Sequence, residues 1–573
     1  MRKNNTKMSA IIHVCVITLV CAYAQAIQVN TTEGVVEGYK ASDGDYLVFY
    51  GIPYAGPTDG KNRFKGPVPP SAYPGLLHAI DSNVICAQPS ERGLIGTENC
   101  LILSIFSKNV TTPKPVIVWL NSEEYTTTNT QMFSYRRFVE EDVVFVSMNF
   151  RLSVFGFLCL GVHEAPGNAG LRDVIQGLEW LQANVANFGG DPKNIVLMGH
   201  ASGAAMVDLL TMSPKAEGLV HKAVALSGSG LAPWAVAYDP AGYANLLGSK
   251  LGYTGKSNEE LAHLLVNTDT SVLHTALSEF RFRNNTPLFA PCIENINLNP
   301  NDTVLADAPI NLLRSGNYLQ IPYIAGYTTR EGTIRAREAA FEHWLEAMQA
   351  DFSEFLPVDL RVGNNRTSVT NSIKDFYFGN TSISMETIED YLDYQGDSLV
   401  VVSVIRGAKE RALISSGEVR LLEFGFLGTL NSDWIYNTIP LNGVKHGGFL
   451  NYLFDHDLRP ADEPVMKSVV QRFAAFAQTG SPAITTNTSL PQWSPITRDL
   501  LNYFFYGGSG AAIISQASIH VEEARFNPHN LTMNYWNALL EKYYEPPTPM
   551  NSSAHFLSSI FVVMLSQILM RLF

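Results

Sequence analysis

The segment at residues 194–210, NIVLMGHASGAAMVDLL, has residue types and spacing that suit a chemical site. An apolar run ends at Gly199, a short turn follows, and a helical pattern begins near Ser202. One large class of hydrolytic enzymes holds a nucleophilic serine at such a strand-to-helix turn, in the pattern G-x-S-x-G. Here the central position is Ala201, and a hydroxyl group stands one residue later, at Ser202.

A shift of one residue changes what the side chain can reach. This turn aims one side chain into the pocket, whereas the following residue contributes its backbone N–H. A misplacement of about 1 Å in a reacting atom can lower a rate about 100-fold. The sequence therefore predicts that Ser202 does not replace a nucleophile at position 201. A working hydrolase with an altered turn, in which Ser202 attacks, is the alternative.

The elements that must position this turn alternate along the chain. Four short apolar runs are typical of buried strands, and a helical pattern separates the second from the third. Strands separated by helices predict an α/β fold with a mainly parallel sheet covered on both faces. We expect one large domain over residues 27–544. The runs are 115–120, 143–150, 194–199 and 321–327, and the helical pattern is 171–188.

Six segments, in order along the chain, identify a family. Together they resemble the type-B carboxylesterase/cholinesterase family, which implies the α/β-hydrolase fold. The resemblance also implies structural ion pairs between Arg63 and Glu98 and between Arg151 and Asp173. The segments are FYGIPYAGPTDGKNRFKGPVPP (49–70), ENCLILSIF (98–106), NFRLSVFGFL (149–158), PGNAGLRDVIQGLEWLQANVANFGGDPKNIVLMG (166–199), LSGSGLAPWA (226–235) and GVKHGGFLNYLF (443–454).

The resemblance assigns roles to the catalytic positions, whose order in this fold is serine, acid, histidine. GYTTREGT places Glu331 at the acid position, and GVKHGG places His446 at the base position. The serine position falls on Ala201, which has no group to attack a carbonyl. The implied triad is therefore degenerate, and a buried Glu331–His446 pair is also satisfied structure without a nucleophile.

The oxyanion site is a second departure from the family pattern. Family members carry a run of glycines there, whose amides bind the developing anion. In VIVWLNSEEYTT, the aligned positions hold Ser122, Glu123 and Glu124. Removing one oxyanion donor lowers a rate by about 10²–10³, and a carboxylate facing the pocket adds electrostatic repulsion. The prediction is that both the nucleophile and the oxyanion site are lost.

Both ends of the chain carry signals for the secretory route. Residues 1–26 have a basic start, an apolar run and small residues near Ala26, which predicts a cleaved signal peptide. Residues 545–554 form a polar stalk ahead of a hydrophobic tail at 555–573. Asn551, Ser552 and Ser553 are candidate attachment sites for a GPI anchor. A single C-terminal transmembrane helix remains the alternative.

Cysteines and glycosylation motifs fit an extracellular location. Cys86 and Cys100 flank a short polar loop and predict a disulfide. Cys159 and Cys292 stand in apolar surroundings and are expected to be buried thiols. Recurrent N-x-S/T motifs predict a glycoprotein. They lie at Asn30, Asn109, Asn284, Asn301, Asn365, Asn380, Asn487, Asn530 and Asn551.

The formal net charge of −13 and the absence of a basic cluster argue against a nucleic-acid partner. We expect no cofactor and no metal site. The sequence most resembles the inactive, adhesion-type members of the family (neurotactin, glutactin, gliotactin and neuroligin). It predicts an anchored glycoprotein that binds an extracellular protein or a small apolar ligand. The last helical pattern, 530–544, could pair with a second copy in a homodimer or pack on its own domain.

Overall fold

The structure is a computed structural model in which 26–128, 133–278, 282–283, 285–431, 439, 442–454, 460–485, 490–509 and 519–550 are described. Outside these residues lie the predicted signal peptide except Ala26, the candidate anchor sites Asn551, Ser552 and Ser553, and the hydrophobic tail. Among the helices that are described, none has both the length and the apolar character that a membrane span requires.

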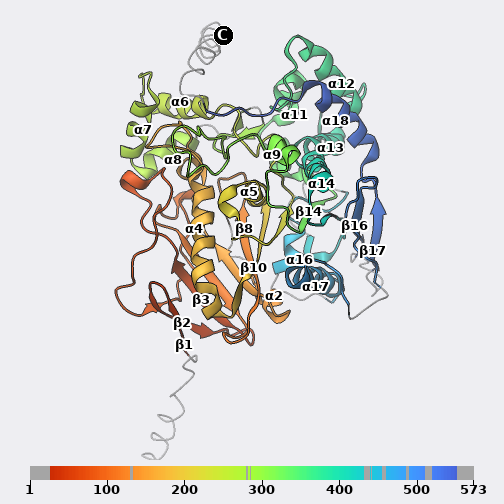
Figure 1. The fold of residues 1–573 in the computed structure, drawn as a ribbon. Coiled ribbons are helices and arrows are strands. Elements are labelled where there is room, and N and C mark those ends of the chain that lie inside the picture. The colour runs from red at the N-terminus through yellow and green to blue at the C-terminus, as the bar shows by residue number, and fades with distance from the viewer. Residues whose placement is uncertain are drawn as a thin grey trace, which may run out of the picture.

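A twisted sheet of thirteen strands runs through the molecule (Figure 1). Its order is β1-β2-β3-β7-β9-β8-β10-β11-β14-β15-β16-β17, with β4 beside β2. The neighbouring strands from β9 to β16 in this order are parallel to one another. The other neighbours in the order are antiparallel, and β4 is parallel to β2. The strands are β1 (Ile27–Thr31), β2 (Gly34–Lys40), β3 (Leu47–Pro53), β4 (Leu77–His78), β7 (Ile102–Ser107), β8 (Lys114–Ser122), β9 (Val144–Met148), β10 (Gly190–Ala201), β11 (Lys222–Leu226), β14 (Tyr323–Thr328), β15 (Val419–Phe424), β16 (Asn502–Ser509) and β17 (Ile519–Phe526). The α/β prediction is confirmed, and the four predicted runs coincide with β8, β9, β10 and β14.

The central strands are apolar on both faces because both faces are covered. In β8, Val116, Val118 and Leu120 pack in the same core as helices α4 and α5. The alternate residues, Ile117 and Trp119, pack in a second core with helix α17. This alternation follows from the two-residue period of a strand. It explains why β8 reads as a continuous apolar run rather than as an alternating one.

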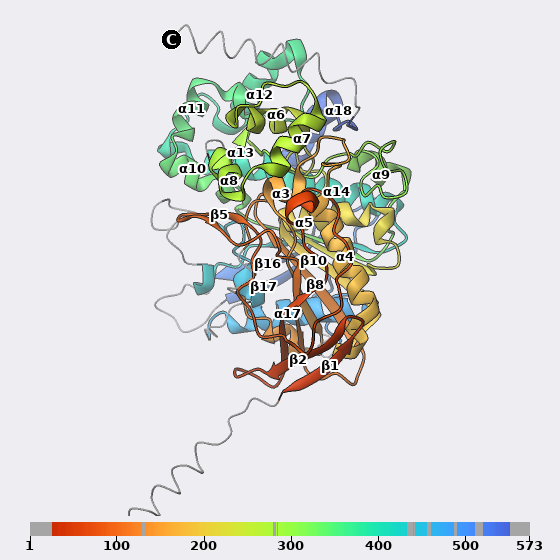
Figure 2. The same cartoon turned by 90° about the vertical axis from the view of Figure 1, so that its left-hand side faces the viewer.

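Helices cover the sheet and gather at one end of the molecule, where α6–α13 and α18 lie at the top of Figures 1 and 2. The pattern predicted at 171–188 forms α4 and a following short 3₁₀ helix. The helices are α2 (Arg136–Glu140), α3 (Ser153–Phe157), α4 (Ala169–Asn184), α5 (Ser202–Thr211), α6 (Pro240–Lys250), α7 (Asn258–Asn267), α8 (Thr270–Ser278), α9 (Pro309–Ser315), α10 (Ala336–Phe341), α11 (Trp344–Ala350), α12 (Arg366–Phe378), α13 (Ile388–Gly396), α14 (Val402–Ile414), α16 (Leu450–Phe454), α17 (Glu463–Thr479) and α18 (Asn530–Tyr543).

Two buried ion pairs hold loops against the sheet, as the family resemblance implies. Arg63 binds Glu98 through two hydrogen bonds of 2.8 Å each. The Arg151 guanidinium binds the fully buried carboxylate of Asp173 at 2.5 and 2.8 Å. Both expected pairs are confirmed. Breaking such a pair costs about 3–5 kcal/mol, because one charge stays buried without compensation.

The cysteines correct one prediction. The Cys86–Cys100 disulfide is confirmed. Cys159 and Cys292, expected as buried thiols, form a second disulfide. The two are 133 residues apart in sequence, and neither local pattern shows that the fold brings them together. Asn168 fixes the contact, because its side chain exchanges two hydrogen bonds with the backbone of Cys292, at 2.8 and 2.9 Å.

The last helix, α18, packs on its own domain. Met533, Trp536 and Leu540 are buried, and the Trp536 indole donates a hydrogen bond of 2.7 Å to the Tyr377 hydroxyl. Tyr535 stacks on Phe376 with ring centroids 4.0 Å apart. Much of the apolar surface of α18 is thus used within one chain, and homodimer formation stays a prediction.

Candidate functional site

The turn between β10 and α5 keeps the strained shape of a nucleophile turn. Ala201 has φ 51° and ψ −121°, a region that residues with a Cβ rarely adopt. Two glycines allow the tight approach. A Cβ at Gly199 would lie 2.5 Å from the carbonyl oxygen of Gly203, and one at Gly203 would lie 2.2 Å from that of Leu120. Ala201 stands at the crest of this turn, and its side chain is only a methyl group.

Ser202 is bound on the inner side of this turn. Its hydroxyl donates a hydrogen bond of 2.7 Å to the carbonyl of Ser122 and lies 3.0 Å from the Ser122 hydroxyl. It also accepts a hydrogen bond of 2.8 Å from the Tyr125 amide. These contacts join the start of α5 to the end of β8. Ser202 is almost fully buried, and its hydrogen bonds are those of a structural residue.

Glu331 and His446 lie together, as the resemblance implies. Glu331 follows β14, and His446 lies in the loop before α16. Glu331 Oε2 is 2.5 Å from His446 Nδ1. The other oxygen, Oε1, accepts hydrogen bonds of 2.6 Å from the Ser227 hydroxyl and from the Thr328 amide. The acid is therefore held in one orientation toward the imidazole.

The outer nitrogen of His446 faces a carboxylate. His446 Nε2 lies 3.3 Å from Glu123 Oε2. In a serine hydrolase this nitrogen accepts the proton of the nucleophilic hydroxyl. Glu123 follows the last residue of β8, at one of the positions where the family pattern has glycines. The carboxylate therefore stands beside the base at the side where a nucleophile would act.

The oxyanion position next to Glu123, Glu124, has its side chain in another contact. The Glu124 carboxylate forms an ion pair with the buried Arg335, so only one of the two glutamates contacts His446. Glu124 and Tyr125 have φ of 53° and 59°, which is the left-handed region that glycine tolerates best. The Glu123 amide donates to the Thr127 carbonyl at 2.9 Å. This amide and that of Tyr125 are thus already hydrogen-bonded.

His200 is a site residue that the sequence reasoning missed. It precedes Ala201, is fully buried, and its Nδ1 lies 3.1 Å from Glu123 Oε1. Its ring centroid is 4.8 Å from that of His446. Its position in the sequence could have pointed to the site, because His200 directly precedes Ala201 at the crest of the turn. Nothing in the local sequence shows that it meets a glutamate from another strand.

Electrostatics at this site favour a positive charge between two carboxylates. Burial alone lowers the pKa of the His446 imidazole, but the carboxylates of Glu331 and Glu123 outweigh burial and raise it above its usual range. Burial alone raises the pKa of Glu123, and His446 and His200 lower it well below its usual range. Glu331 shows the same balance, with His446 lowering its pKa.

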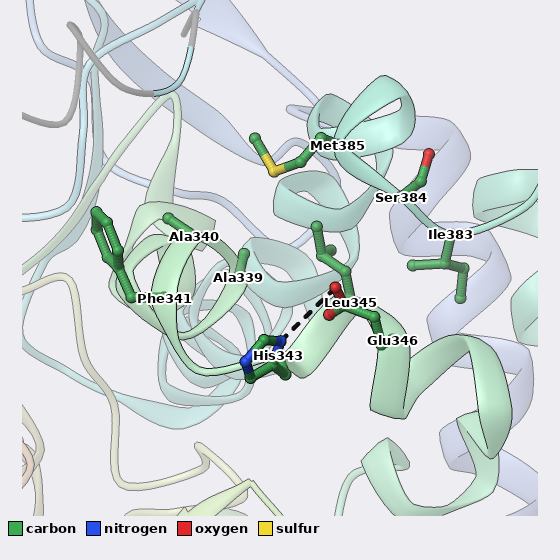
Figure 3. Close-up of a pocket in the computed structure, with 9 residues that line it drawn as sticks. All are labelled: Ala339, Ala340, Phe341, His343, Leu345, Glu346, Ile383, Ser384 and Met385. Carbon is green, nitrogen blue, oxygen red and sulfur yellow. Dashed lines mark ion pairs between the residues drawn. The ribbon is translucent and has the colours of Figure 1, made fainter.

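A cavity of about 260 Å³ lies elsewhere, between α10, α11 and the segment before α13 (Figure 3). Ala339, Leu345 and Ile383 give it an apolar wall, and His343 and Glu346 form an ion pair of 3.8 Å at one side. None of Ala201, Glu331 and His446 lines it. This cavity is therefore separate from the degenerate triad.

The glycosylation motifs that the structure describes lie on the surface. The asparagine is exposed at Asn30, Asn301, Asn365, Asn380 and Asn530, and half-buried at Asn109. Asn284, Asn487 and Asn551 lie outside the described residues. Attachment of glycans remains a prediction.

Comparison with known proteins agrees with the fold. The model of the carboxylesterase family matches residues 25–516. Venom carboxylesterase-6 of Apis mellifera is 26% identical over 82% of this chain and 88% of its own length. Juvenile hormone esterase of Tribolium castaneum is 26% identical over 81% and 85% of the two chains.

A crystal structure of juvenile hormone esterase from Manduca sexta, with OTFP covalently attached, has the same fold. It superposes with a TM-score of 0.79 at 24% identity, over 90% of this chain and 100% of that one. The predicted α/β-hydrolase fold is thereby confirmed. Because the family model matches most of its length, this chain belongs to the carboxylesterase family.

Proposed function

We propose that this chain is an extracellular carboxylesterase-family protein that acts by binding and does not hydrolyse esters through a seryl acyl-enzyme. One observation carries the proposal. The crest of the turn is the methyl group of Ala201, and the outer nitrogen of His446 faces the Glu123 carboxylate at 3.3 Å. Acyl transfer by this fold needs a hydroxyl at that place, aimed at the histidine.

The neighbourhood of Ser202 supports the same proposal. For Ser202 to attack, its hydroxyl would have to leave Ser122 and Tyr125 and pass the turn. Leaving a buried backbone donor or acceptor without a partner costs about 1–3 kcal/mol. A carboxylate about 5 Å from a developing oxyanion adds about 3 kcal/mol of repulsion at an effective dielectric constant near 20. Both effects oppose seryl catalysis at this site.

Ester hydrolysis by another nucleophile is the second candidate function. The similar proteins are named as esterases, and these names favour an active hydrolase more than an adhesion protein. The Glu331–His446 pair is intact. Hydrolysis at this site would then need a nucleophile other than the side chain of residue 201, such as a water molecule.

The two disulfides support the extracellular location, because disulfides persist mainly in oxidising compartments. We propose a tether at the C-terminus, through a GPI anchor or a transmembrane helix, and adhesion through an extracellular protein. A small apolar ligand is the other candidate partner. The apolar wall of the cavity in Figure 3 gives such a ligand a place that is separate from the triad.

Ester turnover by the purified protein tests the proposal. We expect p-nitrophenyl acetate hydrolysis by the wild type to equal that of Ser202→Ala. Turnover that Ser202→Ala abolishes would refute the proposal. Turnover that is well above background and unchanged in Ser202→Ala would favour the second candidate, hydrolysis by a nucleophile other than serine.

A further inference from the structure

Three side chains near Ala201 bring metal-binding atoms together from three separate elements. Glu123 follows β8, His200 lies near the end of β10, and His446 lies in the loop before α16. Each offers one ligand atom, and the three atoms all lie within 4.8 Å of one another. Two histidines and one glutamate are a ligand set that zinc enzymes use, with the fourth position left to water or substrate.

The distances are close to those of a shared ion. Ligands bound to one tetrahedral zinc at about 2.1 Å lie about 3.4 Å from one another. Glu123 Oε1 is 3.1 Å from His200 Nδ1, and Glu123 Oε2 is 3.3 Å from His446 Nε2. The three ligand atoms lie within 4.8 Å of one another, so the widest pair must approach by at most about 1.4 Å to reach this geometry.

His200 provides an independent reason. It is fully buried, and in the described structure neither of its ring nitrogens has a hydrogen-bond partner of correct geometry. Its Nδ1 is near Glu123 in distance but is not aligned for a hydrogen bond. A buried polar group without a partner is unfavourable by about 1–3 kcal/mol. Two ligands of one ion show this same relation, since both point at the ion rather than at each other.

Glu331 contacts the ring nitrogen of His446 that does not face Glu123. Histidines that bind metals usually donate their other ring nitrogen to a carboxylate, which fixes the ring orientation. Glu331 Oε2 lies 2.5 Å from His446 Nδ1, and Glu331 Oε1 accepts hydrogen bonds from Ser227 and Thr328. The Nε2 atom is thereby left facing Glu123. The two carboxylates, Glu123 and Glu331, also balance the charge of one divalent cation.

We propose that Glu123, His200 and His446 bind one divalent ion of the zinc class, with Glu331 as the residue that positions His446. Imidazole ligands favour zinc, copper or nickel over calcium and magnesium, which prefer oxygen. The proposal goes beyond the proposed function and does not depend on it, since an ion can be bound whether or not esters are hydrolysed.

Calorimetric titration with Zn²⁺, after treatment of the full purified protein with a chelator that is then removed, tests the site. We expect one equivalent to bind. Glu123→Gln and His200→Ala should each weaken binding at least 100-fold, and Glu331→Gln about 10–100-fold. His263→Ala is the matched control, because that histidine is exposed on α7, away from the cluster, and it should leave the affinity unchanged.

Co²⁺ spectroscopy on the wild type gives a second measurement that does not depend on the variants folding. We expect visible absorption of the intensity that four-coordinate Co²⁺ shows, displaced by one equivalent of Zn²⁺. Less than half an equivalent of bound Zn²⁺ would overturn the proposal. So would an affinity that Glu123→Gln leaves unchanged, because the cluster would then be only an ion-pair network.

Discussion

The two halves of the degenerate triad differ in what constrains them. In the acid–base half, the buried Glu331 is paired with His446, whose side chain is 8% exposed, so removing either one leaves a charge without compensation. In the nucleophile half, Ala201 makes no polar contact that its neighbours need. A serine at the crest can be lost without penalty to stability, whereas the acid and the histidine cannot. We therefore expect substitutions of Glu331 or His446 to cost more stability than a substitution of Ala201.

The first prediction concerns the acid–base half and has the largest expected effect. His446→Ala leaves the buried Glu331 carboxylate without its cation, and should lower the free energy of unfolding by about 3–5 kcal/mol. Urea denaturation followed by circular dichroism measures it. His343→Ala, at an exposed position, should change it by less than about 0.5 kcal/mol. An equal small loss in both variants would show that the pair does not constrain the site.

The second prediction rebuilds the nucleophile half. Ala201→Ser alone should restore little hydrolysis, because Glu123 still contacts His446. Adding Glu123→Gly removes the opposing carboxylate, and with it about 3 kcal/mol of repulsion toward the developing oxyanion. The double variant should exceed Ala201→Ser by about 10²–10³-fold in kcat/KM for p-nitrophenyl acetate. If Ala201→Ser is already as active as the double variant, the oxyanion side is not impaired.

The third prediction separates the two hydroxyl positions. Ser202→Ala removes the partner of the Tyr125 amide and of the Ser122 carbonyl. It should lower the free energy of unfolding by about 1–3 kcal/mol and leave ester turnover at the wild-type level. A loss of turnover with no change in stability would place Ser202 in catalysis instead.

The fourth prediction compares Glu331, which pairs with His446, with the buried Asp397, which accepts a hydrogen bond from the Tyr377 hydroxyl. Burial raises the pKa of Asp397 to about 7, so the folded state binds its proton more tightly than the unfolded state does. This contribution to stability is fully present below about pH 4 and is lost as the pH rises to about 7. The slope is at most about 1.4 kcal/mol per pH unit. Asp397→Asn should remove this slope, measured by urea denaturation from pH 4 to pH 8.

The sequence predicted the strands and helices whose residue patterns depend on burial of the element itself. The strands β8 and β10 are recognisable because both of their faces are buried, and α4 because its apolar residues repeat with a helical period. The Glu331 and His446 positions followed from short motifs of the family. His200 and the Cys159–Cys292 disulfide could not be predicted in this way, because each depends on a contact between distant segments. Glu123 and Glu124 are adjacent and alike in sequence, and their different partners, His446 for Glu123 and Arg335 for Glu124, come from distant segments.

Covalent labelling by an organophosphate tests the central claim most directly, because it requires an activated serine and no particular ester. The purified protein is incubated with diisopropyl fluorophosphate, and its intact mass and its peptides are measured. The account predicts no stoichiometric adduct in the wild type. An adduct of one phosphoryl group per chain, located on Ser202, would contradict it.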